Sequence, residues 1–230
     1  DLDIKGYKIT LEGIFTKTLR DVMFQQINLK DSIHYADYDV NHQQPMYYTG
    51  KVDNDYTSIF LLTNTNKGYR YSLTAQVKKE YNFGMNVMAA YNFGKSFDIS
   101  NGVRNSFESN WQLNQSLSPN NPQLSYSNFD IRHRIIVSSG YKLKWNKNNK
   151  TTFSLFFTTQ SGSPYTWVIG SNKITGNGQQ IDLAYIPTKE GEILFADYVD
   201  ATGKTITAHD QWVAFDNYIS KDAYLSSRRG

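Results

Sequence analysis

The stretch SNFDIRHRIIVSSGYKLKW, residues 127–145, alternates between apolar and polar side chains. The odd-numbered positions hold the apolar residues Phe129, Ile131, Ile135, Val137, Tyr141, Leu143 and Trp145. The even-numbered positions between them hold Asp130, Arg132, Arg134, Ser138, Lys142 and Lys144. A period of two predicts a β-strand with one apolar and one charged face. This strand is about twice as long as the roughly 5–6 residues that are usual in soluble sheets.

Four further segments show the same odd and even pattern: residues 7–15, 69–77, 85–94 and 152–158. The sequence therefore predicts about five long amphipathic strands, and a strand that crosses a membrane needs about 9–11 residues. The second of the five could begin near Tyr56 and bend at a bulge near Gly68, or NTNKG (residues 64–68) could instead form a hairpin. One bent strand is favoured, because it keeps all the long connections at one end.

The connections between these segments fall into two kinds. YNFGMN (residues 81–86) and WNKNNK (residues 145–150) are short and turn-like, whereas residues 28–55, 96–127 and those after 167 are long and polar. Short periplasmic turns and long extracellular loops are typical of outer-membrane barrels. We expect residues 1–167 to hold the barrel strands with their loops. Residues 168–230 would form a long extracellular insertion, with a hairpin around DATGK and one short helix capped by Thr207 and Asp210.

The composition fits an all-β protein, a segment of a large transmembrane antiparallel β-barrel. A mean hydropathy of -0.57 is too polar for a helical membrane protein, and no run approaches the ~18–20 apolar residues of a spanning helix. The 17 Tyr and 13 Phe can supply the aromatic girdles of a barrel, with Tyr7, Tyr69, Tyr91, Tyr141 and Trp145 at predicted strand ends. His133 is odd-numbered and polar, so we expect it at the extracellular rim. The alternative is a soluble antiparallel sheet with one face on a core, which the period alone does not exclude.

Charge and cysteine content narrow the function classes. The 24 basic and 21 acidic residues are well mixed, which argues against nucleic acid as a partner. Without cysteine the chain has neither a disulfide scaffold nor thiol chemistry. We expect no cofactor.

Several stretches resemble TonB-dependent outer-membrane receptors of the Bacteroidetes type, the Oar-like group with a carboxypeptidase-regulatory-like N-terminal domain. The similar stretches are SNFDIRHRIIVSSGYKL, LEGIFTKTLRDVMFQQINL, LLTNTNKGYRYSLTAQVKKEYNFGMNVMAAYNFGKS, SNW, SGSPYTW, DLAYIP and FDNYISKDAYLSSRRG. They cover almost the whole chain in the expected order. Such receptors have barrels of about 22 strands closed by a plug, so the resemblance implies that this chain is a piece from the C-terminal half of the barrel.

The resemblance also implies a function, a location and partners. It implies energy-coupled uptake of a ligand across the outer membrane of a Gram-negative bacterium, without catalysis. The implied partners are outer-membrane lipid, the rest of the barrel and its plug, the TonB complex through that plug, and a surface lipoprotein. A passive porin, an adhesion barrel and a soluble carbohydrate-binding β-sandwich are the alternatives.

The sequence offers no convincing catalytic or metal site. His34, His42, His133 and His209 each lie apart from any nucleophile motif. Asp37, Asp39 and Asn41 match the first ligand positions of a calcium loop, but His42 replaces its glycine and Tyr48 its glutamate. His34 and His42 lack a third metal ligand.

Two groups of residues are candidates for contact with a transported ligand. Aromatic side chains on the predicted loops could stack on sugars or peptides, or could instead anchor loop packing: Trp111, Tyr126, Tyr165 and Trp167. Charged side chains on the predicted inner face could line the lumen, or could only form ion pairs and bind water: Arg70, Lys78, Arg132, Arg134, Lys142 and Lys144.

Overall fold

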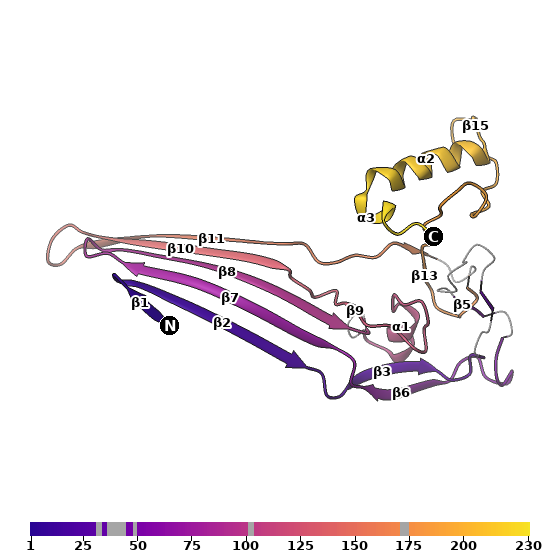
Figure 1. Cartoon of the computed structure of the whole chain (residues 1–230), viewed down its shortest axis with the longest axis horizontal. Coiled ribbons are helices and arrows are strands. Elements are labelled where there is room, and N and C mark those ends of the chain that lie inside the picture. Colours follow the sequence, from indigo (N-terminus) through magenta and orange to yellow (C-terminus); the bar gives the residue numbers. More distant parts are fainter. Residues whose placement is uncertain (31–33, 36–44, 48–49, 101–103, 171–174) are drawn as a thin grey trace. The chain divides into compact units, whose positions relative to one another are not determined.

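The computed structural model describes residues 1–30, 34–35, 45–47, 50–100, 104–170 and 175–230. Its main element is an antiparallel sheet in the order β1-β2-β7-β8-β10-β11, with β9 paired to β8 (Figure 1). The strands are β1 (Leu2–Ile4), β2 (Tyr7–Lys17), β7 (Tyr69–Glu80), β8 (Met85–Asp98), β9 (Ser125–Tyr126), β10 (His133–Lys144) and β11 (Lys150–Gln160). The five long strands have 11, 12, 14, 12 and 11 residues, which confirms the predicted strands and their length.

One register runs through all five long strands. The facing pairs include Tyr7 with Lys79, Tyr69 with Phe97, and His133 with Phe93. In each of the four pairings between the long strands, odd-numbered residues face odd-numbered residues. Because facing residues point to the same side of a sheet, all odd positions share one face and all even positions the other.

The short and long connections lie at opposite ends of this sheet, as predicted. The tight turns at residues 5–6, 81–84 and 145–149 join β1 to β2, β7 to β8 and β10 to β11. The second is closed by a hydrogen bond from the Tyr81 amide to the Met85 carbonyl (2.7 Å), and the third by one from the Trp145 amide to the Asn149 carbonyl (3.0 Å). The long connections leave from the other ends of the strands.

Gly84 shows how closely the second turn fits the sheet. Its φ of 95° is one that side chains rarely adopt, and a Cβ there would lie 2.8 Å from the Lys142 carbonyl oxygen. We expect Gly84→Ala to destabilise the main sheet, which we call the wall, by about 1–3 kcal/mol. The measurement is the temperature at which an unboiled sample loses its compact electrophoretic mobility. Gly6→Ala is the control, since φ there is also positive but nothing lies within 4 Å of the added Cβ. An equal loss in both variants would contradict the role of the Lys142 contact.

NTNKG holds the bend between two successive strands and is not a hairpin. β6 (Phe60–Thr65) pairs with β3 (Asp21–Gln26), while β7 pairs with β2, and β6 and β7 do not pair with each other in the described part of the chain. The Thr18 amide donates a hydrogen bond to the Gly68 carbonyl at 3.1 Å. The two chain segments that pair as β2 with β7 and as β3 with β6 therefore stay side by side through the bend. Gly68 has a φ of 121°. The hairpin alternative is therefore excluded, but the structure has two strands joined by a bend where one bent strand was predicted.

Neither face of the main sheet packs on a hydrophobic core in the described part of the chain. The buried hydrophobic side chains of the described residues all lie outside the five long strands: Met46, Tyr47, Ile99, Trp111, Ile219 and Leu225. Meanwhile Leu11, Phe15, Leu73, Leu155 and Phe157 project from the odd face and are more than half exposed. A sandwich would bury one face between two sheets. This apolar face is instead suited to lipid.

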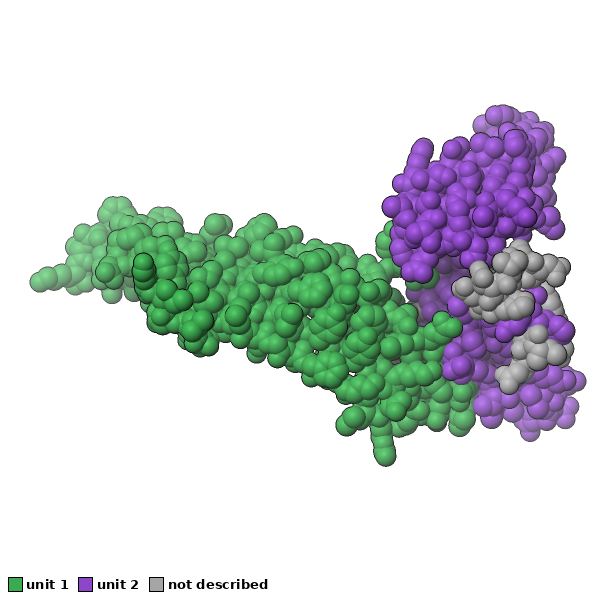
Figure 2. All heavy atoms as spheres, viewed as in Figure 1, with its two compact units in different colours: residues 1–25, 61–110, 122–166 green, residues 26–60, 111–121, 167–230 purple. Residues whose placement is uncertain are grey.

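The chain forms two compact units (Figure 2). One comprises residues 1–25, 61–110 and 122–166 and holds the main sheet; the other comprises residues 26–60, 111–121 and 167–230. The division at residues 166 and 167 lies next to the predicted one. The structure differs from the prediction because residues 26–60 and 111–121 belong to the same compact unit as residues 167–230.

The second unit contains short elements. Its strands are β4 (His34–Tyr35), β5 (Pro45–Met46), β12 (Val168–Ile169), β13 (Asp182–Leu183), β14 (Tyr198–Val199) and β15 (Thr205–Ile206). β14 and β15 form the hairpin predicted around DATGK, and α2 (Ala208–Lys221) is the predicted helix. Two shorter helices were not predicted: α3 (Ala223–Ser226) in this unit, and α1 (Phe107–Gln112), which spans the boundary between the units at residues 110 and 111. None of the described helices is long and apolar enough to cross a membrane.

Candidate functional site

Aromatic side chains form a row on the odd face at each end of the sheet. Towards the long loops, ring centroids follow one another from Phe15 to Tyr69 (6.4 Å), on to Phe97 (4.8 Å) and on to Tyr126 (4.7 Å). At the short turns, Phe83 lies 5.2 Å from Tyr81 and 6.4 Å from Tyr141, and the Lys79 amine lies 3.5 Å from the centre of the Tyr7 ring. These rows match the two girdles of a membrane barrel.

The spacing of the two rows fits a bilayer. Lys17, which faces Tyr69, is ten residues after Tyr7 on β2 (17 − 7 = 10). At about 3.4 Å per residue and a tilt of about 40°, this separates the rows by about 26 Å along the membrane normal, close to the height of about 25 Å that the apolar band of a barrel has. The odd face is therefore the lipid face of the wall, and the even face is the lumen face.

His133 lies at the loop end of the lipid face, as expected for a residue at the extracellular rim. It is the first residue of β10, and its Nδ1 lies 2.7 Å from the Tyr91 hydroxyl. Its ring also contacts those of Tyr91 and Phe93, with centroids 6.1 and 5.5 Å away. The polar ring is thus satisfied within the aromatic row.

The predicted lumen charges on the strands all lie at even positions. Arg70 and Lys78 are on β7, and Arg134, Lys142 and Lys144 are on β10. Lys78 forms an ion pair with Glu80 at 2.7 Å, whereas the other four form no ion pair with the described residues.

Arg132 is held by a buried carboxylate. Asp130 is 2% exposed and accepts hydrogen bonds from the Ser96 amide (2.7 Å) and from Arg132 Nη2 (3.0 Å). The guanidinium carbon of Arg132 lies 4.6 Å from the centre of the Tyr126 ring. Arg132 and Tyr126 therefore fix the loop ends of β8, β9 and β10, a structural role that the charge pattern did not show.

Trp111 packs inside the protein, which favours the packing-anchor alternative over the ligand-contact alternative for this residue. It is 2% exposed, its Nε1 donates to Asn120 Oδ1 at 3.0 Å, and its ring centroid lies 5.8 Å from that of Phe60. The Gln179 side-chain amide donates to the Trp111 carbonyl (2.8 Å) and to that of Asn114 (3.0 Å). This residue thus lies inside the second unit.

Tyr165 and Trp167 are exposed, as a ligand contact requires. Tyr165 has 72% of its surface exposed and Trp167 has 37%. The Trp167 ring packs edge-on against Tyr218 on α2, with centroids 5.5 Å apart. Tyr126 is 44% exposed, so for it and for these two residues the ligand-contact interpretation stays a prediction.

The second unit also buries polar side chains that sequence reasoning missed. Asn28 donates to the Asp53 and Tyr56 carbonyls and accepts from the Asp53 amide, and Thr175 donates to the buried Asp182 carboxylate. In the described residues, no buried side-chain nitrogen or oxygen atom lacks a hydrogen-bond partner. These residues stand in polar loops without periodicity, so no sequence signal separates them from solvated residues.

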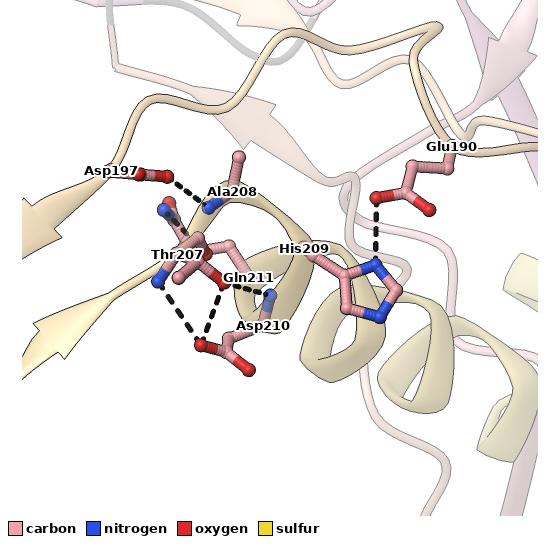
Figure 3. A network of polar contacts seen from close by, with 7 residues as sticks. All are labelled: Glu190, Asp197, Thr207, Ala208, His209, Asp210 and Gln211. Carbon is pink, nitrogen blue, oxygen red and sulfur yellow. Dashed lines mark hydrogen bonds and ion pairs between the residues drawn. The ribbon is translucent and has the colours of Figure 1, made fainter.

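The start of α2 is held by carboxylates (Figure 3). Thr207 Oγ1 accepts from the Asp210 amide (3.1 Å) while the Thr207 amide donates to the Asp210 carboxylate (3.2 Å), which confirms the predicted capping box. Asp197 accepts from the Ala208 amide at 2.6 Å. Hydrogen bonds to Thr207 lower the pKa of the Asp210 carboxyl.

Glu190 makes this helix start sensitive to pH. Its Oε1 lies 3.0 Å from His209 Nδ1, and this hydrogen bond raises the pKa of His209. Since the folded pKa lies above the unfolded value of about 6.5, the contact stabilises the fold below that value and loses its effect as pH rises through the folded pKa. We expect proteolysis within residues 190–209 on intact cells to increase from pH 5 to pH 8. Glu190→Gln removes this dependence.

The control is Glu192→Gln, whose carboxylate instead accepts from the Thr188 amide at 2.7 Å. It should retain the pH dependence of the wild type. Loss of the dependence in both variants would contradict the assignment to His209.

The described residues contain no group of three or more His, Cys, Asp or Glu that could hold a metal ion. His34 is described and exposed. The rest of the calcium-like pattern, Asp37, Asp39, Asn41, His42 and Tyr48, lies outside the described residues.

Comparison with known proteins supports the assignment of the main sheet to the wall of a membrane barrel. A family model described as an outer membrane beta barrel domain matches residues 16–227. No curated protein and no solved structure matches the chain. The match begins at the end of β2 and covers the other four long strands with the loops between them. The chain therefore belongs to the family of outer membrane beta barrel domains, and its location is the outer membrane of Gram-negative bacteria.

Proposed function

We propose that this chain supplies wall and extracellular loops to a TonB-dependent transporter, which takes up a ligand with energy from the inner-membrane proton gradient. The observation that supports it is the fold of the long connections. Residues 26–60, 111–121 and 167–230 form a compact unit with its own buried residues, among them Trp111, Asn28 and Gln179. A receptor that selects its ligand needs built loops of this kind, whereas a passive pore needs only an open lumen.

In this proposal the chain binds and conducts but catalyses no reaction. Further strands extend the sheet beyond β1 and β11, the two ends of its strand order in the described residues, because a bare sheet edge in lipid leaves backbone groups unpaired. A plug inside the lumen contacts the TonB complex, and a surface lipoprotein covers the loops. Nucleic acid is not a partner.

Two measurements on the full-length protein test this function. In a planar lipid bilayer we expect no steady conductance until a high concentration of urea unfolds the plug. Chemical crosslinking in living cells should join the protein to TonB. A steady open-channel conductance without urea, together with no TonB crosslink, would favour a passive porin and overturn the proposal.

A further inference from the structure

Apolar side chains interrupt the polar lumen face at Ile14 of β2 and at a separate group of three on neighbouring strands. Met88, Ile136 and Phe156 stand at even positions of β8, β10 and β11. The register aligns Met88 with Ser138 and Ser138 with Phe156, and it places Ile136 one row nearer the long loops. Diagonal neighbours of this kind lie about 7–8 Å apart, within reach of long side chains. We call these three residues the apolar island.

No described residue fully covers the side chains of the island on the lumen face. Phe156 is 67% exposed, and Met88 and Ile136 are half-buried. An exposed Phe on a face meant for water costs free energy unless something apolar covers it. Met88 and Phe156 also offer adaptable, polarisable surface, which suits ligands of varied shape.

A polar row borders the island towards the long loops. Asn92, Arg134 and Gln160 face one another across β8, β10 and β11. Arg134 is exposed and forms no ion pair with the described residues. Glu12 occupies the same row but lies three strand spacings away, about 14 Å, so it does not neutralise Arg134.

We propose that the island and Arg134 together bind an amphipathic organic anion, a carboxylate with an aliphatic or aromatic tail. The tail covers Met88, Ile136 and Phe156, and the carboxylate takes a two-pronged, charge-assisted bond from the Arg134 guanidinium. The proposal rests on the transport function above and names its substrate class. Charge complementarity selects this occupant, since Lys142 on the same face also forms no ion pair with the described residues and an anion is attracted from both ends of the strand.

The size of the island agrees with a small ligand. It spans three side chains on adjacent strands and is bordered by the polar row towards the loops and by Asn86 and Ser154 towards the turns. An acyl chain or a single ring covers such a patch, whereas the face of a folded domain is much larger.

The test uses the full-length protein with Ser138→Cys, in the centre of the island, in outer-membrane vesicles. The rate of modification by a small charged thiol reagent is measured with decanoate, decanol or acetate present. We expect decanoate to slow the reaction about tenfold at about ten times its dissociation constant, with far smaller effects of decanol and acetate. Ser72→Cys, on the same face of β7, controls for effects of decanoate on the lipid.

Second substitutions in the Ser138→Cys background separate the two parts of the site. Arg134→Gln should remove the advantage of decanoate over decanol, and Phe156→Gln should weaken protection by both. Arg70→Gln, a lumen cation farther from the island, should change neither. Equal protection by decanol and decanoate would overturn the proposal, as would a Ser138→Cys thiol that is unreactive without any probe, because another part of the protein would then cover the island.

The assay requires neither TonB nor a proton gradient, so the two proposals fail separately. TonB crosslinking without decanoate protection rejects only the anion site. Decanoate protection without TonB crosslinking rejects only the energy coupling.

Discussion

Gln76→Cys is expected to react with a membrane-impermeant thiol reagent at least about tenfold faster than Ala75→Cys, when each full-length variant is held in lipid nanodiscs. The two residues are neighbours on β7, a strand paired on both sides, but lie on opposite faces, since Gln76 faces Thr10 and Ala90 while Ala75 faces Leu11 and Tyr91. Hydrocarbon excludes the charged reagent and disfavours the reactive thiolate at position 75. The measurement is the rate of mass increase for each variant.

Because the two positions differ by one residue, local chain mobility and distance from the loops are nearly matched. The unsubstituted protein gives the background rate. Equal rates would mean that neither face is in contact with lipid, and a faster Ala75→Cys would invert the assignment of lipid face and lumen face.

Trp111→Ala is expected to cost about 3–5 kcal/mol of stability in the second unit, because a large buried ring is replaced by a cavity. The change also removes the donor to Asn120 Oδ1. A loss of this size is a large part of the roughly 5–15 kcal/mol that stabilise a typical domain, so the loops should be cleaved faster by protease on intact cells. The measurement is the rate of cleavage within residues 111–121 and 175–230.

Tyr165→Ala is the matched control, since its ring is 72% exposed and its loss should change stability by no more than about 0.5 kcal/mol. Heat-dependent mobility of each variant on gels reports whether the wall itself has folded. If Trp111→Ala left the loops resistant to protease but abolished ligand uptake, the ring would be a ligand contact after all.

The sequence predicted the wall well because a membrane strand has a simple period. The same alternation recurs in five segments. Because successive strands run in opposite directions, their connections alternate between the two ends of the sheet, which places the short turns at one end and the long loops at the other. His133 could be placed at the rim because a polar residue on the lipid face costs little free energy only near the membrane interface. These inferences need no knowledge of which strand lies beside which.

The apolar island was missed for a physical reason. In SLFFTT, residues 154–159, three apolar residues stand together, and the odd positions Leu155 and Phe157 already satisfied the pattern. The alternation puts Phe156 on the opposite face from these two residues, but only the register with Ser138 shows that it lies near Met88 and Ile136. The pattern describes each strand alone, whereas the island exists only across three strands.

The second unit could not be predicted in the same way. Its core depends on side-chain hydrogen bonds between distant segments, such as those from Gln179 to the carbonyls of Trp111 and Asn114. Polar side chains that bond one another look in sequence like side chains that bond water. The hairpin and α2 were predictable because turn residues and a capping box act locally.

The constant register of the wall restricts how such a protein can change over evolutionary time. Deleting one residue inside a strand such as β10 would turn every following side chain of that strand to the opposite face, so that Lys142 would point to the lipid side and Leu143 to the lumen. A cation on the lipid face costs about 2–4 kcal/mol at the bilayer midplane and about 0–1 kcal/mol near the interfaces, so such a deletion is most costly in the middle of a strand. The long connections carry no comparable restriction on length. Insertions and deletions should therefore accumulate in them, while related proteins keep strands of identical length.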